Sequence, residues 1–148
     1  MVREKKSVQD EVGKGTEKFI AKTFRNFGYW AYNIPKKTEG QPCDIVAIKG
    51  CKHSEKTISW LVDAKHVREN EVSFPFSRIE PNQITAMAYA KQYAKIKNVG
   101  FAIFFERTKK LYWFPYDDYI RYSQLNAVSV NMNELEIMES VLRNEDDH

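Results

Sequence analysis

The sequence has few residues that bind zinc or form disulfides. It contains two cysteines, Cys43 and Cys51, and three histidines, and their spacing matches no common zinc finger or redox motif. Two cysteines without such a motif suit a compartment in which thiols stay reduced. We therefore expect a cytoplasmic protein with neither a structural disulfide nor a zinc site.

Long apolar runs are also missing. No segment approaches the roughly 20 apolar residues that cross a bilayer, and the start, MVREKKSVQD, lacks the apolar region of a signal peptide. We expect no membrane partner. The sequence also shows no internal repeat and no low-complexity segment, so its 148 residues with 43% hydrophobic content predict one domain. We place that domain at residues 13–148, after a mobile basic arm over residues 1–12.

The net charge of +3 is too small to indicate a nucleic-acid partner by itself. Its distribution is more informative, because basic residues gather near the start of the chain and before the first acidic strand. The candidate phosphate contacts are Arg3, Lys5, Lys6, Lys14, Lys36 and Lys37. Solvated turns and a mobile terminus account for each cluster equally well.

The spacing of apolar residues predicts an α/β fold. Phe19, Ile20, Phe24 and Phe27 recur every three to four residues, which predicts a helix from Gly13 to about Gly28. Further strands are predicted over 29–34, 44–49, 59–65, 99–105 and 111–115, further helices over 81–96, 117–124 and 133–143, and a loop over 66–79. This order predicts a mixed sheet flanked by helices, with an α-β-β-β-α-β core, an extra strand and C-terminal helices.

Two neighbouring strands carry the candidate chemistry. In SWLVDAKH, Asp63 and Lys65 are two positions apart, so both project from one face of an extended strand. In QPCDIVAIK, Asp44 opens the preceding strand and can approach Asp63 if the two strands form a hairpin. Two carboxylates beside a lysine suit a hard divalent cation and phosphodiester hydrolysis. Glu17, at the edge of the apolar stripe of the first helix, is either a third acid or a glutamate favoured by the helix dipole.

The arrangement of Glu17 on a helix, Asp44 opening a strand and Asp63-Ala64-Lys65 closing the next resembles the PD-(D/E)xK nuclease superfamily, with its restriction-endonuclease-like core. The segment FPFSRIEPNQITAM is similar to the one that follows the active-site strand in RecU-type Holliday junction resolvases, where a Phe-Pro pair leads to a helix with a glutamine. Gln83 matches that glutamine, and NVGFAIFFERTKKLYWFPYDDYIRY continues the likeness. The resemblance covers roughly residues 13 to 122.

This resemblance implies a homodimeric endonuclease that depends on Mg²⁺ or Mn²⁺ and cuts four-way junctions or other branched DNA. Asp44, Asp63 and the Ala64 carbonyl would hold the metal, and Glu17 would bind through water or a second ion. Lys65 would orient or help to deprotonate the attacking water, and Gln83 would contact that water or a phosphate. Arg78, just before the second predicted helix, would clamp a phosphate or stabilise its loop.

The sequence departs from the RecU pattern in two places. It has Asp63 where RecU proteins more often have Glu, and only PKKTEGQPC where they have a long stalk between the first two strands. Compact archaeal-type resolvases also lack a stalk. Two alternatives therefore stay open, a nuclease of this fold acting on duplex or single-stranded DNA in repair, restriction or defence, and an inactive DNA-binding module. For a dimer, we expect the aromatic segment from Val99 to Phe114, near the sheet edge, to form part of the interface.

Overall fold

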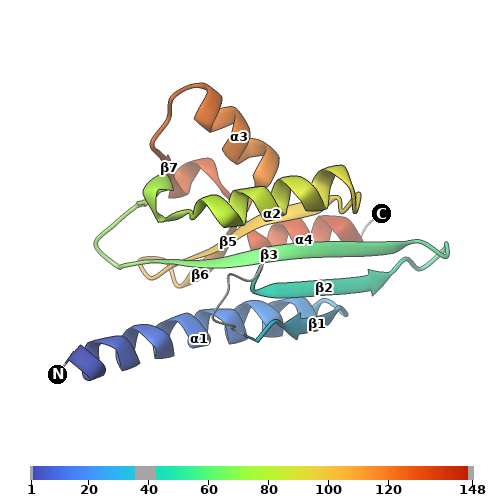
Figure 1. Cartoon of the computed structure of the whole chain (residues 1–148). Helices are drawn as coiled ribbons and strands as arrows, with labels where there is room; N and C mark the ends of the chain where they lie inside the picture. The colour runs from blue at the N-terminus through green and yellow to red at the C-terminus, as the bar shows by residue number, and fades with distance from the viewer. Residues whose placement is uncertain (1, 36–42, 147–148) are drawn as a thin grey trace.

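The computed structural model describes residues 2–35 and 43–146, with side chains between residues 12 and 145 (Figure 1). Four α-helices and eight strands follow one another in the described part, with two short 3-10 helices between them. In chain order they are α1 (Val2–Asn26), β1 (Trp30–Asn33), β2 (Ile45–Gly50), β3 (Thr57–Val67), β4 (Ser73–Pro75), η1 (Phe76–Arg78), α2 (Pro81–Gln92), β5 (Asn98–Phe105), β6 (Lys110–Pro115), α3 (Tyr116–Gln124), β7 (Ser129–Asn131), η2 (Met132–Glu134), β8 (Glu136–Ile137) and α4 (Met138–Asp146).

Six strands form one mixed sheet in the order β1-β2-β3-β5-β6-β8, and β4 pairs with β7 in a small second sheet. β3 and β5 are parallel, and every other neighbouring pair is antiparallel. The α2 helix is the crossover between β3 and β5, as a parallel pair requires. The predicted α/β class and mixed sheet are confirmed.

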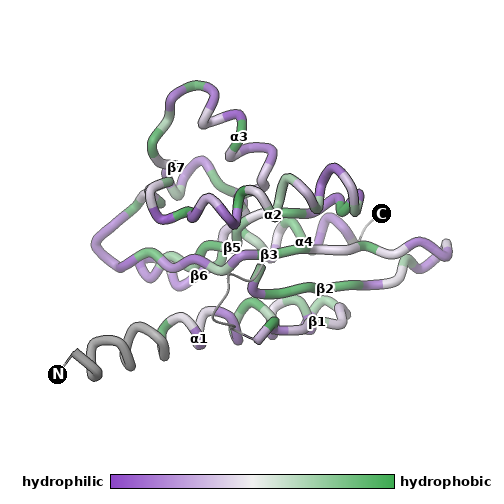
Figure 2. Tube along the Cα trace, in the orientation of Figure 1, coloured by the Kyte–Doolittle hydropathy of each residue, from purple (hydrophilic) through white to green (hydrophobic). Residues whose placement is uncertain are grey.

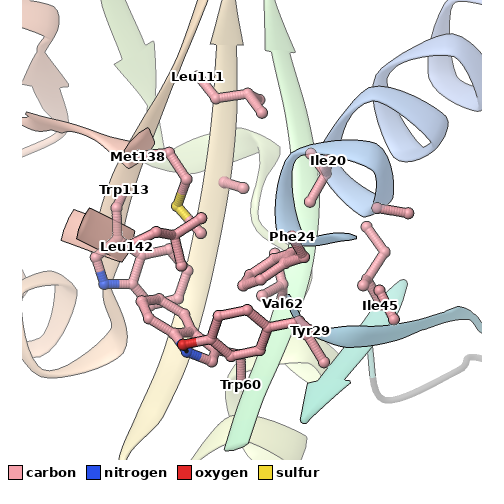
Figure 3. Packing of buried hydrophobic residues seen from close by; sticks show 14 residues of the cluster. Ile20, Phe24, Tyr29, Ile45, Trp60, Val62, Leu111, Trp113, Met138 and Leu142 are labelled. Carbon is pink, nitrogen blue, oxygen red and sulfur yellow. Dashed lines mark hydrogen bonds between the residues drawn. The ribbon is translucent and has the colours of Figure 1, made fainter. Parts of the chain in front are cut away.

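Helices cover both faces of the large sheet and bury a separate apolar cluster on each. On one face, Phe24 of α1, Tyr29, and Trp60 of β3 contact one another edge to face, and Trp60 also contacts Trp113 (Figure 3). Met138 and Leu142 of α4 complete this cluster. The other face buries Phe101 and Phe114 under α2, α3 and the β4-β7 pair. The two faces of β3 therefore pack against two different apolar clusters.

The hydrophobic residues follow this layering. In Figure 2 the strands are hydrophobic through much of their length, whereas the turn that joins β2 to β3 is hydrophilic. None of the described helices is long and apolar enough to cross a membrane.

The first helix begins earlier than predicted. α1 starts at Val2, so the described backbone is already helical before Gly13, while the division into an arm and a domain at residue 12 stays a prediction. The segment from Val2 to Val12 contains no proline or glycine and is rich in Arg, Lys, Glu and Gln, which are good helix formers. Gly13 and Gly15 lie inside the helix, where each is tolerated at a cost of about 1 kcal/mol.

Three further details differ from the prediction. The predicted loop over 66–79 contains β4 and η1, the predicted helix over 133–143 is split into η2, β8 and α4, and α2 ends at Gln92 rather than near Ile96. The strands in question have only two or three residues, which is too short for an alternating pattern to be recognised.

The proposed dimer segment is also misplaced. β5 lies between β3 and β6, and the short β8 pairs with Tyr112 and Trp113 of β6, so this segment is near the edge of the sheet but is not its outermost strand. Val99, Phe101, Phe105 and Phe114 are all buried within the chain. Their hydrophobicity is explained by the core, and an interface requires other residues.

Gly100 in β5 provides a test of the packing between β5 and β6. A Cβ atom at this position would lie 2.4 Å from the Phe114 carbonyl oxygen and 2.9 Å from Cα of Pro115. Because these are backbone atoms, Gly100→Ala should destabilise the fold by at least about 2 kcal/mol, measured by urea unfolding. Gly15→Ala is the control, since nothing lies within 4 Å of its Cβ position, and it should stabilise α1 by about 0.5–1 kcal/mol. Equal stabilities of the two variants would contradict this packing.

Candidate active site

The site forms where β3 continues past the start of β2. Ile45, the first residue of β2, pairs with Val62, so the backbone of Ala64 has no β2 residue opposite it. The Asp44 side chain takes that place, and its Oδ2 accepts a hydrogen bond from the Ala64 N–H at 2.7 Å. The Asp44 N–H donates to the Val62 carbonyl at 3.0 Å. Asp44 is therefore held in position by its side chain and its backbone, beside Asp63.

Asp63 and Lys65 project from the same face of β3, as their spacing predicts, and Lys65 Nζ lies 3.1 Å from Asp63 Oδ2. Gln83 of α2 joins them: its Nε2 donates to Asp63 Oδ1 at 3.2 Å, and its Oε1 accepts from Lys65 Nζ at 3.1 Å. The same Oε1 accepts from the backbone N–H of Glu80 in a capping box at the start of α2. Gln83 is thus both a helix-capping residue and the link between the acid and the lysine.

The Asp63 carboxyl is only 2% exposed. Burial raises its pKa from 3.8 to about 8, the nearby Lys65 opposes the rise, and Asp44 adds to it. Its Oδ2 is paired with the Lys65 ammonium at 3.1 Å, without the geometry of a full hydrogen bond. The neighbouring Asp44 and Asp63 carboxylates repel each other until a proton or a cation neutralises one of them.

All five predicted catalytic residues line one open cleft with a volume of about 1070 Å³. Asp44, Asp63, Lys65 and Gln83 come from the sheet and α2, whereas Glu17 reaches the cleft from α1. Ala64 lines the same cleft. Its carbonyl points to the same side of β3 as its N–H, which is the side on which β2 pairs with the earlier part of β3.

The oxygen atoms of Asp44, Asp63 and Ala64 suit a magnesium ion that is bound by two protein carboxylates. Among the described residues, no three His, Cys, Asp or Glu side chains are close enough to hold a metal ion together, so Glu17 does not complete a three-acid cluster. Mg²⁺ is commonly bound by one or two carboxylates and keeps several waters. Asp44, Asp63 and the Ala64 carbonyl, all in the lining of the cleft, supply two carboxylates and one carbonyl oxygen for such an ion.

The candidate phosphate contacts are only partly described. Lys14 is exposed on α1, the side chains of Arg3, Lys5 and Lys6 are not described, and Lys36 and Lys37 lie outside the described residues. Arg78 lines the cleft, but its guanidinium donates to the His66 carbonyl and lies over the Phe74 ring, 5.6 Å from the centroid. Burial lowers the pKa of Arg78. These contacts favour the loop-stabilising alternative, and the phosphate contact of Arg78 stays a prediction.

Sequence reasoning missed one pair in the cleft wall. His66 Nε2 lies 2.7 Å from Glu106 Oε1, and Glu106 Oε2 accepts from the Glu69 N–H at 2.9 Å. The two residues are forty positions apart, and only the parallel pairing of β3 with β5 brings them together. This pair connects the end of β3 to the β5-β6 turn.

The fold was compared with those of known proteins. No family model and no curated protein sequence matches the chain. Among solved structures, the Holliday junction resolvase Hjc from the archaeon Archaeoglobus fulgidus aligns with a TM-score of 0.58 and 14% identity, over 88% of this chain and 94% of Hjc. The chain therefore has the fold of Hjc. D212, a nuclease from a fusselovirus, aligns over 95% of this chain and 90% of its own, with a TM-score of 0.48 and 13% identity.

The buried acid of this Hjc-like fold predicts a pH dependence of stability. The native pKa of Asp63, about 8, lies above the value of 3.8 for an unperturbed carboxyl, so the native state keeps its proton to a higher pH than the unfolded state. The free energy of unfolding therefore falls as the pH rises from about 4 to about 8. Asp63→Asn replaces the carboxyl with an uncharged amide, so the variant does not lose stability as the pH rises. In EDTA at pH 9 it should melt at least about 2–4 °C above the wild type.

The measurement is a series of thermal melts at pH 5, 7 and 9. Asp117→Asn, at an exposed carboxylate on α3, is the control and should show no comparable pH-dependent gain. An advantage of Asp63→Asn that is constant across pH, or larger at pH 5, would contradict the raised pKa.

Proposed function

We propose that this protein is a metal-dependent, structure-selective DNA endonuclease that hydrolyses phosphodiester bonds in four-way junctions or other branched DNA. The observation that carries the proposal is the buried Asp63 carboxyl beside Asp44, bracketed by Lys65 and Gln83 in an open cleft. The Hjc-like fold supports it, and the matched residues favour a RecU-like member of the PD-(D/E)xK superfamily. Recombination or phage DNA processing in the cytoplasm is the corresponding setting.

The residues divide the chemistry among them. Asp44, Asp63 and the Ala64 carbonyl would hold Mg²⁺ or Mn²⁺, and Glu17 would act through water. The bound ion would lower the pKa of a bound water and polarise the phosphoryl oxygen. Lys65 supplies a positive charge and N–H donors next to the same carboxylate, where they can orient the attacking water and stabilise charge on the phosphate. Gln83 fixes the relative positions of Asp63 and Lys65 through its two hydrogen bonds.

Basic residues outside the cleft would bind the DNA backbone. We assign this role to Arg3, Lys5, Lys6 and Lys14 along α1, and to Lys36 and Lys37 before Asp44. Val12 and Gly13 of α1 line the cleft, so DNA that enters the cleft would pass close to Lys14. A nuclease of this fold acting on plain duplex or single strands shares all of these features, and an inactive DNA-binding module would not need the Asp63-Lys65-Gln83 arrangement.

The test of the proposal is cleavage of labelled four-way junction, duplex and single-stranded DNA. Asp44→Ala, Asp63→Ala and Lys65→Ala should each reduce cleavage by at least about 100-fold and leave DNA affinity within a few-fold of the wild type, since binding rests on many phosphate contacts. Asp118→Ala, on the surface of α3, is the control and should cut normally. Ca²⁺ should support binding without cleavage, because it is a poorer Lewis acid with longer ligand distances. Wild-type turnover by any of the three cleft variants would refute the assignment.

A homodimer is part of the proposal, because resolution of a two-fold junction needs two matched cuts and each chain has one site. With the β5-β6 segment buried, we assign the interface to the outer face of α2. There Tyr89 and Tyr93 are 64% and 63% exposed, and their ring centroids are 4.6 Å apart.

Sedimentation at micromolar concentration should give twice the chain mass. Tyr89→Arg combined with Tyr93→Arg should give monomers, whereas Leu125→Arg, at an exposed residue after α3, should leave the dimer intact. A monomeric wild type without junction preference would favour the nuclease acting on duplex or single strands.

A further inference from the structure

The proposed site leaves one exposed aromatic pair unexplained. Trp30 and Tyr32 of β1 are 59% and 48% exposed, although large aromatic side chains are usually mostly buried. Their rings are stacked, with an interplanar angle of 6° and centroids 5.9 Å apart. We call this exposed pair of parallel rings the aromatic shelf.

The shelf lies on the same sheet face as the candidate site. Trp30 pairs with Ile48 and Tyr32 with Val46, and these β2 residues alternate with the buried Ile45 and Ala47, which face α1. Asp44 precedes Val46 by two residues, so it shares the face of Val46 and of the shelf.

The shelf also leads directly to Asp44. Ile34, two residues after Tyr32, donates its N–H to the Asp44 carbonyl at 2.8 Å. Side chains on one face of a strand are spaced by about 7 Å, so Trp30, Tyr32 and Ile34 form a row that ends beside the proposed metal ligand. Asp44, which lines the cleft, is thus the residue that connects the cleft to the row of the shelf.

We infer that the aromatic shelf stacks against unpaired bases of the DNA that flank the cleaved phosphodiester. This inference rests on the proposed nuclease function and adds a preference for substrates with unpaired nucleotides next to the cut. Exposed aromatic rings are the usual binding surface for unpaired bases, because every base has a π-face. A paired duplex offers no such face except at its ends.

Two observations argue against a protein partner on the shelf. Two half-exposed aromatic side chains offer roughly 200–300 Å², well below the about 800 Å² per partner of a stable interface. The outer edge of β1 is also partly blocked, since Arg25 Nη2 donates to the Ala31 carbonyl at 2.9 Å. An added β-strand would compete with that hydrogen bond.

The experiment measures affinity for two DNA probes in Ca²⁺, using the full chain. One probe is a forked duplex with two unpaired arms, and the other is a fully paired duplex of the same length with sealed ends. Trp30→Ala and Tyr32→Ala should each weaken fork binding by about 5- to 100-fold and change duplex binding by less than twofold. Trp30→Phe should largely restore fork binding, and Trp30→Leu should not.

The controls separate this inference from the proposed function. Leu125→Ala should bind both probes as the wild type does, and the melting temperatures of Trp30→Ala and Tyr32→Ala should stay close to that of the wild type, because both side chains are exposed. Equal losses on both probes, or full fork affinity in Trp30→Leu, would overturn the shelf while Mg²⁺-dependent cleavage by the wild type still supported the nuclease. Dimer loss in Trp30→Ala would identify a second copy of the chain as the occupant instead. A wild type that neither binds nor cuts DNA would overturn both.

Discussion

Burial of the Asp63 carboxyl beside Asp44 is the constraint on which the rest of the site depends. A buried carboxylate next to a second one is unfavourable unless charge or hydrogen bonds compensate it. Lys65 and Gln83 supply part of that compensation, yet burial still raises the pKa of Asp63 to about 8. The remaining deficit is what makes the pair suited to a divalent cation, which would supply the missing charge without new protein contacts.

The parallel pairing of β3 with β5 explains why Gln83 meets residues some twenty positions earlier in the sequence. The α2 crossover must run back along β3, which brings its first turn next to the end of the strand where Asp63 and Lys65 lie. The capping box with Glu80 then fixes the Gln83 side chain. On the opposite face, Val62 packs in the apolar cluster with Trp60 and Phe24, so β3 is anchored by one face while the other carries the polar groups.

The sequence was sufficient for the parts of the fold with strong periodicity and for the residues that share a strand. Alternation placed Asp63 and Lys65 on one face, and the hairpin brought Asp44 beside them. It was insufficient where geometry is set by tertiary pairing: β8 covers the edge of β6, so the aromatic segment expected at an interface is core. The His66-Glu106 pair had no local signal. The exposure of Trp30 and Tyr32 also depends on which strands the helices cover, which composition does not reveal.

Calorimetric titration of the metal-free protein with Mn²⁺ at pH 7 tests the central claim most directly. Because Asp63 has a pKa of about 8, it is largely protonated at this pH and must lose its proton to become a ligand. Titrations in buffers of different ionisation enthalpy should show one ion bound with release of nearly one proton, and Asp63→Ala and Asp44→Ala should each abolish this binding. Binding that persists in Asp63→Ala, or that releases no proton, would contradict the account.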